Sequence, residues 1–412
     1  MKKDIIIIGG GIIGLMSAYY LHKQGKTVTI IDKSDITDGT SFGNAGLLSA
    51  FGKNPMSCPG VLFDTFKLII KGQSPLSIHP TLDFKIYKWL YTFAKNSTQE
   101  RLKKTLILFE RYGKISLDIY REMTVEDKMD FHFCQDGLLM VYTEQNTFDK
   151  KVELAQDGSK YEVISKEKTK EYLPFVNDKI IGSVLLKQNA HLDPTLLMNE
   201  VKNYLVTNGV EIITNEEVLK LEFENSKVSK IHTSKNSYQA ETFILSTGAD
   251  DLLSSQAKNN FLMTPAKGYS ITFEMDEKLK PKTCALFADL FMAITPRKKT
   301  VRLTSKLELG TTDQEVVKKQ IDSILHNFSL FSNPIEMKNI VEWTGFRPLT
   351  PNDMPLIGCD ETYTNLVHAT GLGWLGITFA PAVGKIIGDL IVKDKINKNN
   401  LDILLFSGFY QG

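Results

Sequence analysis

The stretch DIIIIGGGIIGLMSAYYLHKQGKTVTIID, residues 4–32, decides the fold. Residues 4–8 predict a buried strand, because four of the five are isoleucine. Residues 12–24 predict a helix that Gly25 stops, and residues 27–32 predict a second buried strand. The segment is therefore expected to form a β-α-β unit with parallel strands.

Three glycines in this unit, Gly9, Gly11 and Gly14, follow the pattern G-x-G-x-x-G between the first strand and the helix. The first permits a tight turn, the second lets a pyrophosphate approach the backbone, and the third lets the helix pack closely. Asp32, at the end of the second strand, is placed to accept ribose hydroxyls and disfavours a 2′-phosphate. The sequence therefore predicts binding of an adenine dinucleotide, either FAD or NAD.

The composition excludes several other classes of protein. The 412 residues carry a net charge of +1 without a basic run, so a nucleic-acid partner is not expected. Cys58, Cys134, Cys284 and Cys359 form no C-x-x-C pair, and the histidines lack ligand spacing, so no metal is assigned. The apolar stretch at 61–70 is about half the ~20 residues that a membrane span needs. We expect no transmembrane segment and a cytoplasmic protein.

A small-residue loop, TSFGNAGLL at residues 40–48, follows the β-α-β unit. In this position it resembles the flavin-binding loop of the D-amino acid oxidase superfamily of FAD-dependent oxidoreductases, and within it the bacterial D-amino acid dehydrogenases and glycine oxidase. Further motifs carry the resemblance along the chain: HLDP at 191–194, EVL at 217–219, FILSTGAD at 243–250, PAKGY at 265–269, WTGFRPLTP at 343–351, PLIG at 355–358 and HATGLGWLGITFAP at 368–381.

The fold class expected is mixed α/β. Periodicity predicts helices within 59–123 and short strands from residue 131 onward. The resemblance implies a discontinuous Rossmann-like FAD-binding domain and an inserted substrate domain of antiparallel sheet and helices. The FAD-binding domain is expected at 1–80, 150–258 and 345–412, and the substrate domain at 81–149 and 259–344.

The resemblance implies that FAD is the cofactor. It implies noncovalent attachment, because Gly345 stands close to the position where relatives with covalent flavin carry a cysteine. The residues expected to bind FAD are Gly9, Gly11, Ile12, Ile13, Gly14, Asp32, Lys33, Thr40, Ser41, Asn44, Ala45, Gly46, Leu47, Val218, Thr247, Gly248, Gly371, Leu372, Gly373, Trp374, Leu375, Gly376, Ile377 and Thr378.

Substrate contacts are expected from Arg347, whose planar guanidinium can hold a carboxylate with two hydrogen bonds. Tyr269 and Phe346 are further candidates, with core packing as an equal alternative. Ala293 stands where glycine oxidase-like relatives carry a substrate-binding tyrosine, which implies a wider pocket. The flavin is the reactive group, so no catalytic acid or base is assigned.

The activity implied is oxidation of a small amino acid, by hydride transfer from Cα to flavin N5, to an imine and then a 2-oxo acid. A D-amino acid or a cyclic imino acid such as D-proline or hydroxy-D-proline is the leading substrate. A glycine or sarcosine oxidase that releases peroxide is one alternative. An FAD-carrying subunit of a larger complex, or a tRNA-modifying flavoprotein, is the alternative from another class.

The electron acceptor is expected to be a quinone or another carrier, with molecular oxygen as the alternative. A positive charge beside the flavin helps oxygen reduction, and Arg302 and Lys267 are the candidate cations. Alternation along the predicted strands favours a solvent-facing position for both. Peripheral contact with the inner face of the membrane is left open.

Overall fold

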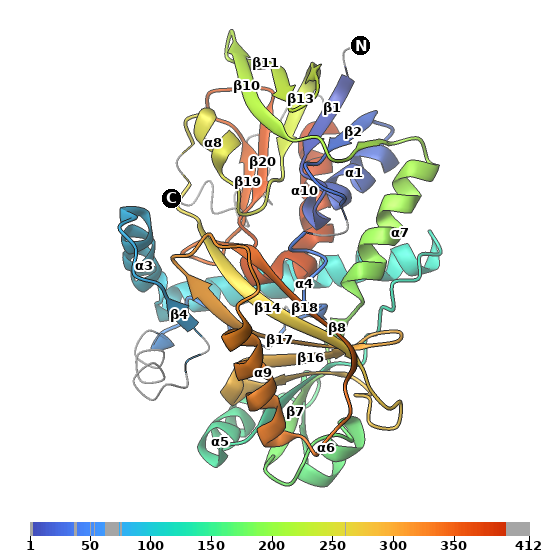
Figure 1. Ribbon diagram of the computed structural model, residues 1–412, viewed down its shortest axis with the longest axis vertical. Coiled ribbons are helices and arrows are strands. Elements are labelled where there is room, and N and C mark those ends of the chain that lie inside the picture. Colours follow the sequence, from blue (N-terminus) through green and yellow to red (C-terminus); the bar gives the residue numbers. More distant parts are fainter. Residues whose placement is uncertain are drawn as a thin grey trace.

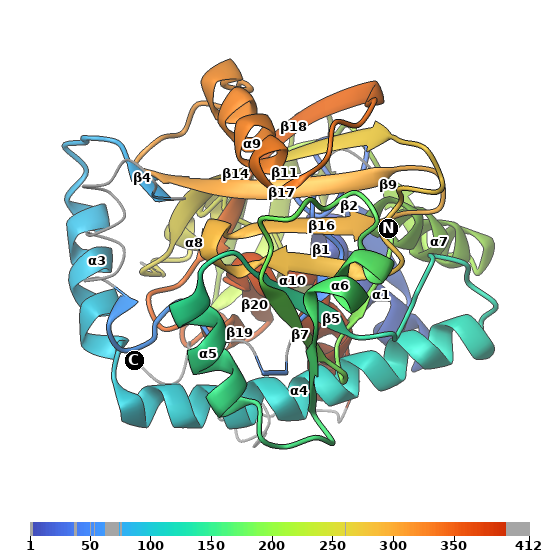
Figure 2. The ribbon, with the colours of Figure 1, turned by 90° about the horizontal axis from the view of Figure 1, so that it is seen from below.

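The computed structural model describes residues 3–36, 39–49, 51–52, 54–61, 74, 76–259 and 261–392. Two sheets organise this part of the chain (Figure 1). The sheet of the predicted β-α-β unit lies in the upper part of Figure 1, and the larger sheet lies below it. The long helix α4, Gln99–Val125, crosses the molecule at the height where the two sheets meet in Figure 1, and Figure 2 shows that it runs along one side.

The predicted β-α-β unit is confirmed as β1 (Lys3–Ile8), α1 (Ile12–Lys23) and β2 (Val28–Ile31). The two strands are parallel, with Ile5 opposite Val28. Among the described residues their sheet has the order β19-β20-β13-β1-β2-β9. Its other strands are β9 (Glu211–Ile213), β13 (Ala240–Leu245), β19 (Leu356–Cys359) and β20 (Leu366–Thr370), of which β19 alone is antiparallel to its described neighbour.

Both faces of this sheet are covered, which explains why β1 is apolar throughout. Ile5 and Ile7 pack into the core formed with helices α1, α7 (Pro194–Thr207) and α10 (Gly376–Val392). Ile6 and Ile8 point the other way, into the core formed with the small sheet of β10 (Val218–Glu224), β11 (Lys227–Thr233) and β12 (Ser237–Tyr238).

The larger sheet has the order β18-β14-β17-β16-β15-β5-β7-β6 among the described residues, with β4 paired to β17. Helix α9 (Lys318–Phe331) packs on one face through Ile321, Ile324 and Phe328, and Figure 2 shows it above the sheet. The strands are β4 (Leu76–Ile78), β5 (Leu138–Tyr142), β6 (Tyr161–Ile164), β7 (Gly182–Leu186), β14 (Thr264–Glu274), β15 (Cys284–Phe287), β16 (Met292–Pro296), β17 (Val301–Leu309) and β18 (Lys338–Leu349).

The predicted helical region contains α3 (Phe84–Asn96) and α4, but also the short strand β4, which the periodicity did not predict. Residues 62–73 of that region lie outside the described residues. Remaining elements are α5 (Gln145–Leu154), α6 (Lys166–Tyr172), α8 (Leu252–Gln256), β3 (Leu47–Leu48), β8 (Ala190–His191) and the short 3-10 turns Ala288–Leu290 and Gly373–Leu375.

The expected domain limits do not coincide with the sheets. Strands β6 and β7 lie within 150–258, yet they belong to the larger sheet and not to the six-stranded one. The limit at 344/345 falls inside β18, and the limit at 149/150 falls inside α5. The division into domains therefore stays a prediction. Strands β6, β7 and β18 belong to the larger sheet.

Helix α10 and the turn before it, Gly373–Ile391, are long and apolar enough for a membrane span, but 72% of that window is buried inside the protein. Pro381 lies within the helix and has no N–H to donate to the Ile377 carbonyl. The Tyr120 hydroxyl of α4 donates to that carbonyl instead, at 2.7 Å. Helix α10 is thus a core helix whose first turn is fixed by α4.

Candidate functional site

A cavity of about 470 Å³ opens at the carboxyl ends of the parallel strands. Ile8, Ile31 and Ala369, at or near the ends of β1, β2 and β20, line it, and so do the residues that follow β13. Ligands bind at this edge of open α/β sheets, and the volume lies within the usual range for ligand pockets. The cavity is therefore the candidate site.

The three glycines of the first turn are required for different reasons. A Cβ atom on Gly14 would lie 2.0 Å from the Gly9 carbonyl oxygen, so this glycine is required by the fold itself. Gly9 has a φ of 101°, which favours glycine. Gly11 has an ordinary φ of −61° and would meet only Ser41 Oγ, at 3.6 Å. A side chain at Gly11 would instead fill the cavity, as expected if a pyrophosphate approaches there.

Asp32 lies at the other side of the first turn and lines the cavity. Its Oδ2 accepts the Gly10 N–H at 2.6 Å, and its Oδ1 accepts the Ser34 N–H at 2.8 Å. These bonds fix the carboxylate and leave lone pairs for ligand hydroxyls. Glu216, whose N–H donates to the Asp32 carbonyl, lines the same end of the cavity.

The predicted flavin loop divides between the cavity and the larger sheet. Thr40, Ser41 and Asn44 line the cavity, and Ser41 Oγ accepts the Ile12 N–H at the start of α1. Ala45 and Leu47 pack instead against buried side chains of the larger sheet. The loop therefore connects the glycine turn to that sheet.

The second glycine loop, residues 371–377, closes the cavity from the C-terminal side. Gly371, Leu372, Gly373, Gly376 and Ile377 line it, immediately before and at the start of α10. The free N–H groups and the positive end of a helix dipole lie at such a start. This edge of the cavity therefore favours negative charge in a bound group.

Arg347 lines the cavity with Phe346 and Pro348 of β18. Within the described residues its guanidinium forms no hydrogen bond or ion pair with another side chain or with the backbone. Burial lowers its pKa to about 10. A Cβ atom on Gly268 would lie 2.2 Å from Arg347 Nη1, so the guanidinium rests directly over this glycine. An unpaired, partly buried cation in a cavity wall is poised for an anionic ligand.

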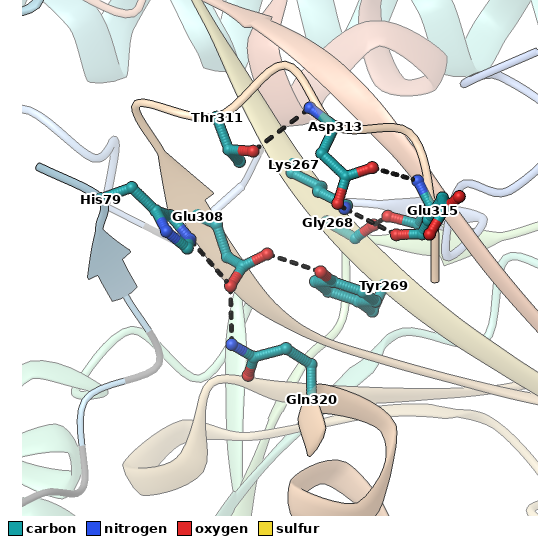
Figure 3. A network of polar contacts seen from close by, with 10 residues as sticks. His79, Lys267, Gly268, Tyr269, Glu308, Thr311, Asp313, Glu315 and Gln320 are labelled. Carbon is teal, nitrogen blue, oxygen red and sulfur yellow. Dashed lines mark hydrogen bonds and ion pairs between the residues drawn. The ribbon is translucent and has the colours of Figure 1, made fainter. Parts of the chain in front are cut away.

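Tyr269, the third candidate for substrate contact, does not line the cavity. It is fully buried, and its hydroxyl donates to Glu308 Oε2 at 2.5 Å (Figure 3). Gln320 also donates to Glu308, and His79 lies 3.2 Å from it. Burial opposes ionisation of Glu308, but these hydrogen bonds outweigh it and lower its pKa. Tyr269 thus belongs to a polar network inside the core.

Arg302 and Lys267 are buried, so the expectation that both face solvent was wrong. Arg302 is 3% exposed and donates to the carbonyl oxygens of Phe42 and Asn44, at 2.6 and 2.9 Å. Lys267 is 1% exposed and donates to the Glu315 carbonyl at 2.6 Å (Figure 3). Arg302 therefore holds the flavin loop against the larger sheet.

Most of the sequence-predicted residues converge on the cavity. Those of the expected FAD set that do not line it are Gly14, Ala45, Gly46, Leu47, Trp374, Leu375 and Thr378. Cavity-lining residues outside the expected FAD-binding and substrate sets include Ser34, Gly39, Glu216, Ser246, Asp250, Leu253, Pro265, Thr312, Gln314 and Thr370.

The sequence matches known proteins over its whole length. The family described as "FAD dependent oxidoreductase" matches residues 4–390. A protein of Helicobacter pylori named D-amino acid dehydrogenase is 54% identical over 411 residues, which cover 100% of both chains. A protein of Vibrio vulnificus (strain YJ016) with the same name is 27% identical, over 98% of this chain and 99% of that one.

Solved structures share the fold at lower identity. Glycine oxidase from Bacillus cereus matches with a TM-score of 0.75 and 21% identity, over 98% of each chain. L-proline dehydrogenase from P. horikoshii matches with a TM-score of 0.72 and 19% identity, over 99% of this chain and 97% of that one. The predicted mixed α/β flavoprotein fold is therefore confirmed, and the chain belongs to the family of FAD-dependent oxidoreductases.

Proposed function

We propose that this chain is an FAD-dependent D-amino acid dehydrogenase. The observation that carries the proposal is the guanidinium of Arg347 in the wall of the cavity, which has no polar partner among the described residues. The relatives named D-amino acid dehydrogenase, which match over the full length, support the substrate class. The glycine turn, Asp32 and the loop before α10 are the residues that would hold FAD.

Arg347 binds the substrate carboxylate through two parallel hydrogen bonds, which the planar guanidinium provides without rearrangement. Gly268 gives it the room to lie flat on the backbone of β14. Phe346 supplies an apolar wall beside the carboxylate. These contacts fix the position of Cα and present its hydrogen in one direction.

When bound, FAD supplies the two-electron oxidant that takes the Cα hydrogen as a hydride. The start of α10 and the N–H groups of residues 371–377 favour the negative charge that this transfer creates. The amine, having lost the hydride and a proton, becomes an imine, and water then releases ammonia and a 2-oxo acid.

Noncovalent attachment of FAD is also proposed. A Cβ atom on Gly345 would lie 2.2 Å from the ring of Trp343, so a cysteine does not fit at this position without displacing the tryptophan. Acid or heat denaturation of the purified protein should therefore release free FAD into the supernatant. Flavin that stays with the precipitated chain would contradict the proposal.

Anaerobic flavin bleaching tests the function. We expect small D-amino acids or D-proline to bleach the yellow holoenzyme, and their L-enantiomers to leave it oxidised. Glycine and sarcosine serve as the comparison for a glycine oxidase. Bleaching by glycine or sarcosine alone, or by L-amino acids as fast as by D-amino acids, would refute the proposed substrate class.

A quinone or another carrier is the proposed electron acceptor. Arg302 and Lys267, the cations considered for oxygen activation, both donate to backbone carbonyl groups. Neither is therefore free to approach a developing superoxide. We expect slow reoxidation of the reduced enzyme by air and fast reoxidation by a soluble quinone in stopped-flow measurements. Air reoxidation as fast as turnover, with stoichiometric peroxide, would make the chain an oxidase.

Helix α3 is the proposed site of contact with the inner face of the membrane, from a cytoplasmic position. Leu82 and Phe84 are 93% and 84% exposed at its start, and Tyr87 and Tyr91 are exposed on the same helix. The helix carries lysines and no acidic residue, so its exposed face suits an anionic lipid surface.

The buried side of α3 lies near the site. Trp89 Nε1 donates to the Leu349 carbonyl, two residues after Arg347. Sedimentation with vesicles containing phosphatidylglycerol tests the contact. We expect binding by the holoenzyme and at least a tenfold loss in a Leu82→Ser/Phe84→Ser variant. Leu154→Ser, which changes a 75% exposed leucine of α5, is the matched control. Equal binding by both variants would refute the contact.

A further inference from the structure

A histidine, a cysteine and a second histidine converge beside the flavin loop. His132 and Cys134 lie between α4 and β5, and His191 lies in β8. One ligand atom from each, two ring nitrogens and the thiol sulfur, lie within 4.8 Å of one another. The backbones of Cys134 and His191 form a bridge with two hydrogen bonds of 2.9 Å, so the backbone already brings these two residues together.

His191 is the residue whose surroundings need an explanation. It is 1% exposed, and its Nδ1 atom forms no hydrogen bond. The Asp136 carboxylate lies 3.3 Å from that atom, without the alignment of a hydrogen bond. A buried polar atom without a hydrogen bond is destabilising, and such atoms are rare in folded proteins. A metal bound by the other ring nitrogen would fix the tautomer, so that Nδ1 carries a proton that it can donate to Asp136.

We propose that His132, Cys134 and His191 bind a divalent transition metal of the zinc class. Two imidazole nitrogens and one thiolate form a ligand set that zinc prefers, with a fourth position for water. Zinc–ligand distances of ~2.1 Å to nitrogen and ~2.3 Å to sulfur place ligand atoms about 3.5 Å apart in a tetrahedral site. The described atoms therefore need to move by only about 1 Å.

Charge also favours the metal. The thiolate of Cys134 and the carboxylate of Asp136 together balance the charge of a divalent ion, so the site would be neutral as a whole. Asp136 is held in place by the Thr283 hydroxyl, which donates to it at 2.9 Å. A carboxylate beside a metal-bound histidine fixes the ring and strengthens the site.

The metal would act on the neighbouring flavin loop. Leu47 pairs with His191 across strands β3 and β8, and the Leu192 N–H donates to the Gly46 carbonyl at 3.0 Å. A metal that joins His191 to His132 and Cys134 would therefore clamp this part of the loop to the segment after α4. We expect metal binding to raise the melting temperature and to slow the release of FAD.

Titration of the purified, metal-free holoenzyme with Co²⁺ tests the site directly. Co²⁺ in a four-coordinate site with a thiolate ligand absorbs at longer wavelengths than oxidised flavin, so the flavin does not obscure it. We expect saturation at one Co²⁺ per chain and displacement by Zn²⁺. The Cys134→Ser variant should lose the absorption, and Asp136→Asn should weaken binding by about 10- to 100-fold.

Three further variants separate loss of the site from loss of the fold. His132→Gln changes a partly exposed ligand and should abolish the absorption while the flavin spectrum stays normal. Cys58→Ser and His326→Gln, which lie outside the cluster, are the matched controls and should bind as the unchanged protein does. Absence of the absorption, or binding unchanged in Cys134→Ser and His132→Gln, would overturn the proposal. His191 would then be a histidinium paired with Asp136.

Discussion

Replacing Arg347 with methionine tests the proposed substrate contact. The change removes a cation that has no described protein partner and leaves a flexible apolar side chain over Gly268. Removal of one partner from a desolvated charge pair costs about 2–5 kcal/mol. At about 1.4 kcal/mol for each factor of ten, kcat/KM should fall by about 30- to 4000-fold. Arg347→Lys should recover only part, because an ammonium cannot make two parallel hydrogen bonds.

Arg347→Met should leave the stability of the fold unchanged or raise it, whereas replacement of an ordinary, paired buried arginine lowers stability. Burial lowers the pKa of Arg347 to about 10, so the folded protein holds this charge at a cost that methionine would not carry. Arg297 is the control, since it donates to Asp193 and Thr195. Arg297→Met leaves Asp193 buried without its partner and should cost about 3–5 kcal/mol of folding free energy.

Dye-coupled kinetics under anaerobic conditions, flavin spectra and thermal melts of the three variants provide the assay. The expected pattern for Arg347→Met is a normal flavin spectrum, an unchanged or higher melting temperature and a large loss of kcat/KM. Kinetics within threefold of the unchanged enzyme would mean that another cation holds the carboxylate. A fall in melting temperature as large as that of Arg297→Met would refute the view that Arg347 is unpaired.

Gly11→Val should fold but purify without FAD, because its side chain enters only the cavity. Gly14→Val should also lower the melting temperature, because its side chain would collide with the Gly9 backbone. Normal FAD binding by Gly11→Val would contradict the assignment of this turn to the pyrophosphate. Glu308→Gln should lose about 1.5–3 kcal/mol at pH 7, since its carboxylate accepts several hydrogen bonds. The lowered pKa of Glu308 stabilises the fold above the ordinary glutamate value of 4.5, and this contribution is lost as the pH falls through the pKa of the folded state. The difference in melting temperature between the unchanged protein and Glu308→Gln should therefore shrink below pH 4.5. A difference that does not change with pH would exclude an ionised Glu308. Arg302→Met should release FAD about tenfold faster in dilution experiments, because two carbonyl groups of the flavin loop lose their charged donor. An unchanged rate of release would show that the loop does not need Arg302 to hold FAD.

The sequence predicted the cofactor half of the fold well because its signals are local. Four isoleucines in β1, a helix start at a glycine turn and the acidic end of β2 lie within one continuous segment. Short strands were likewise predicted from residue 131 onward, and β5 and β11 lie in that range. Long-range pairing was not needed for these elements.

The larger sheet was harder to predict, because its two faces are both covered. Alternation assigns polar residues of an antiparallel strand to solvent, and this reasoning failed for Arg302 and Lys267. Their partners are backbone carbonyls of loops far away in the sequence, which no local pattern reveals. Tyr269 was ambiguous for the same reason, since its partner Glu308 lies on the next strand.

Some site residues were missed although a signal existed. Glu216 directly precedes the EVL motif, Ser246 lies within the FILSTGAD motif, and both line the cavity. Thr312 and Gln314 come from a loop after β17 for which the sequence offered no motif. His132 and Cys134 have the spacing H-x-C, but His191 joins them only through the strand pairing of β8.

The order of strands in the six-stranded sheet has a consequence for how the protein is made. β1 lies next to β13, and β13 lies next to β20, so the ribosome has to reach residue 370 before the sheet can close. At about 5–20 residues per second, the open edge of the nascent β1 waits about 10–50 seconds for β13, which ends at residue 245. During that time an almost purely isoleucine strand has an unpaired edge, which is prone to aggregation. Chaperone capacity during synthesis, more than the stability of the finished fold, should therefore limit the yield of this protein in a foreign host.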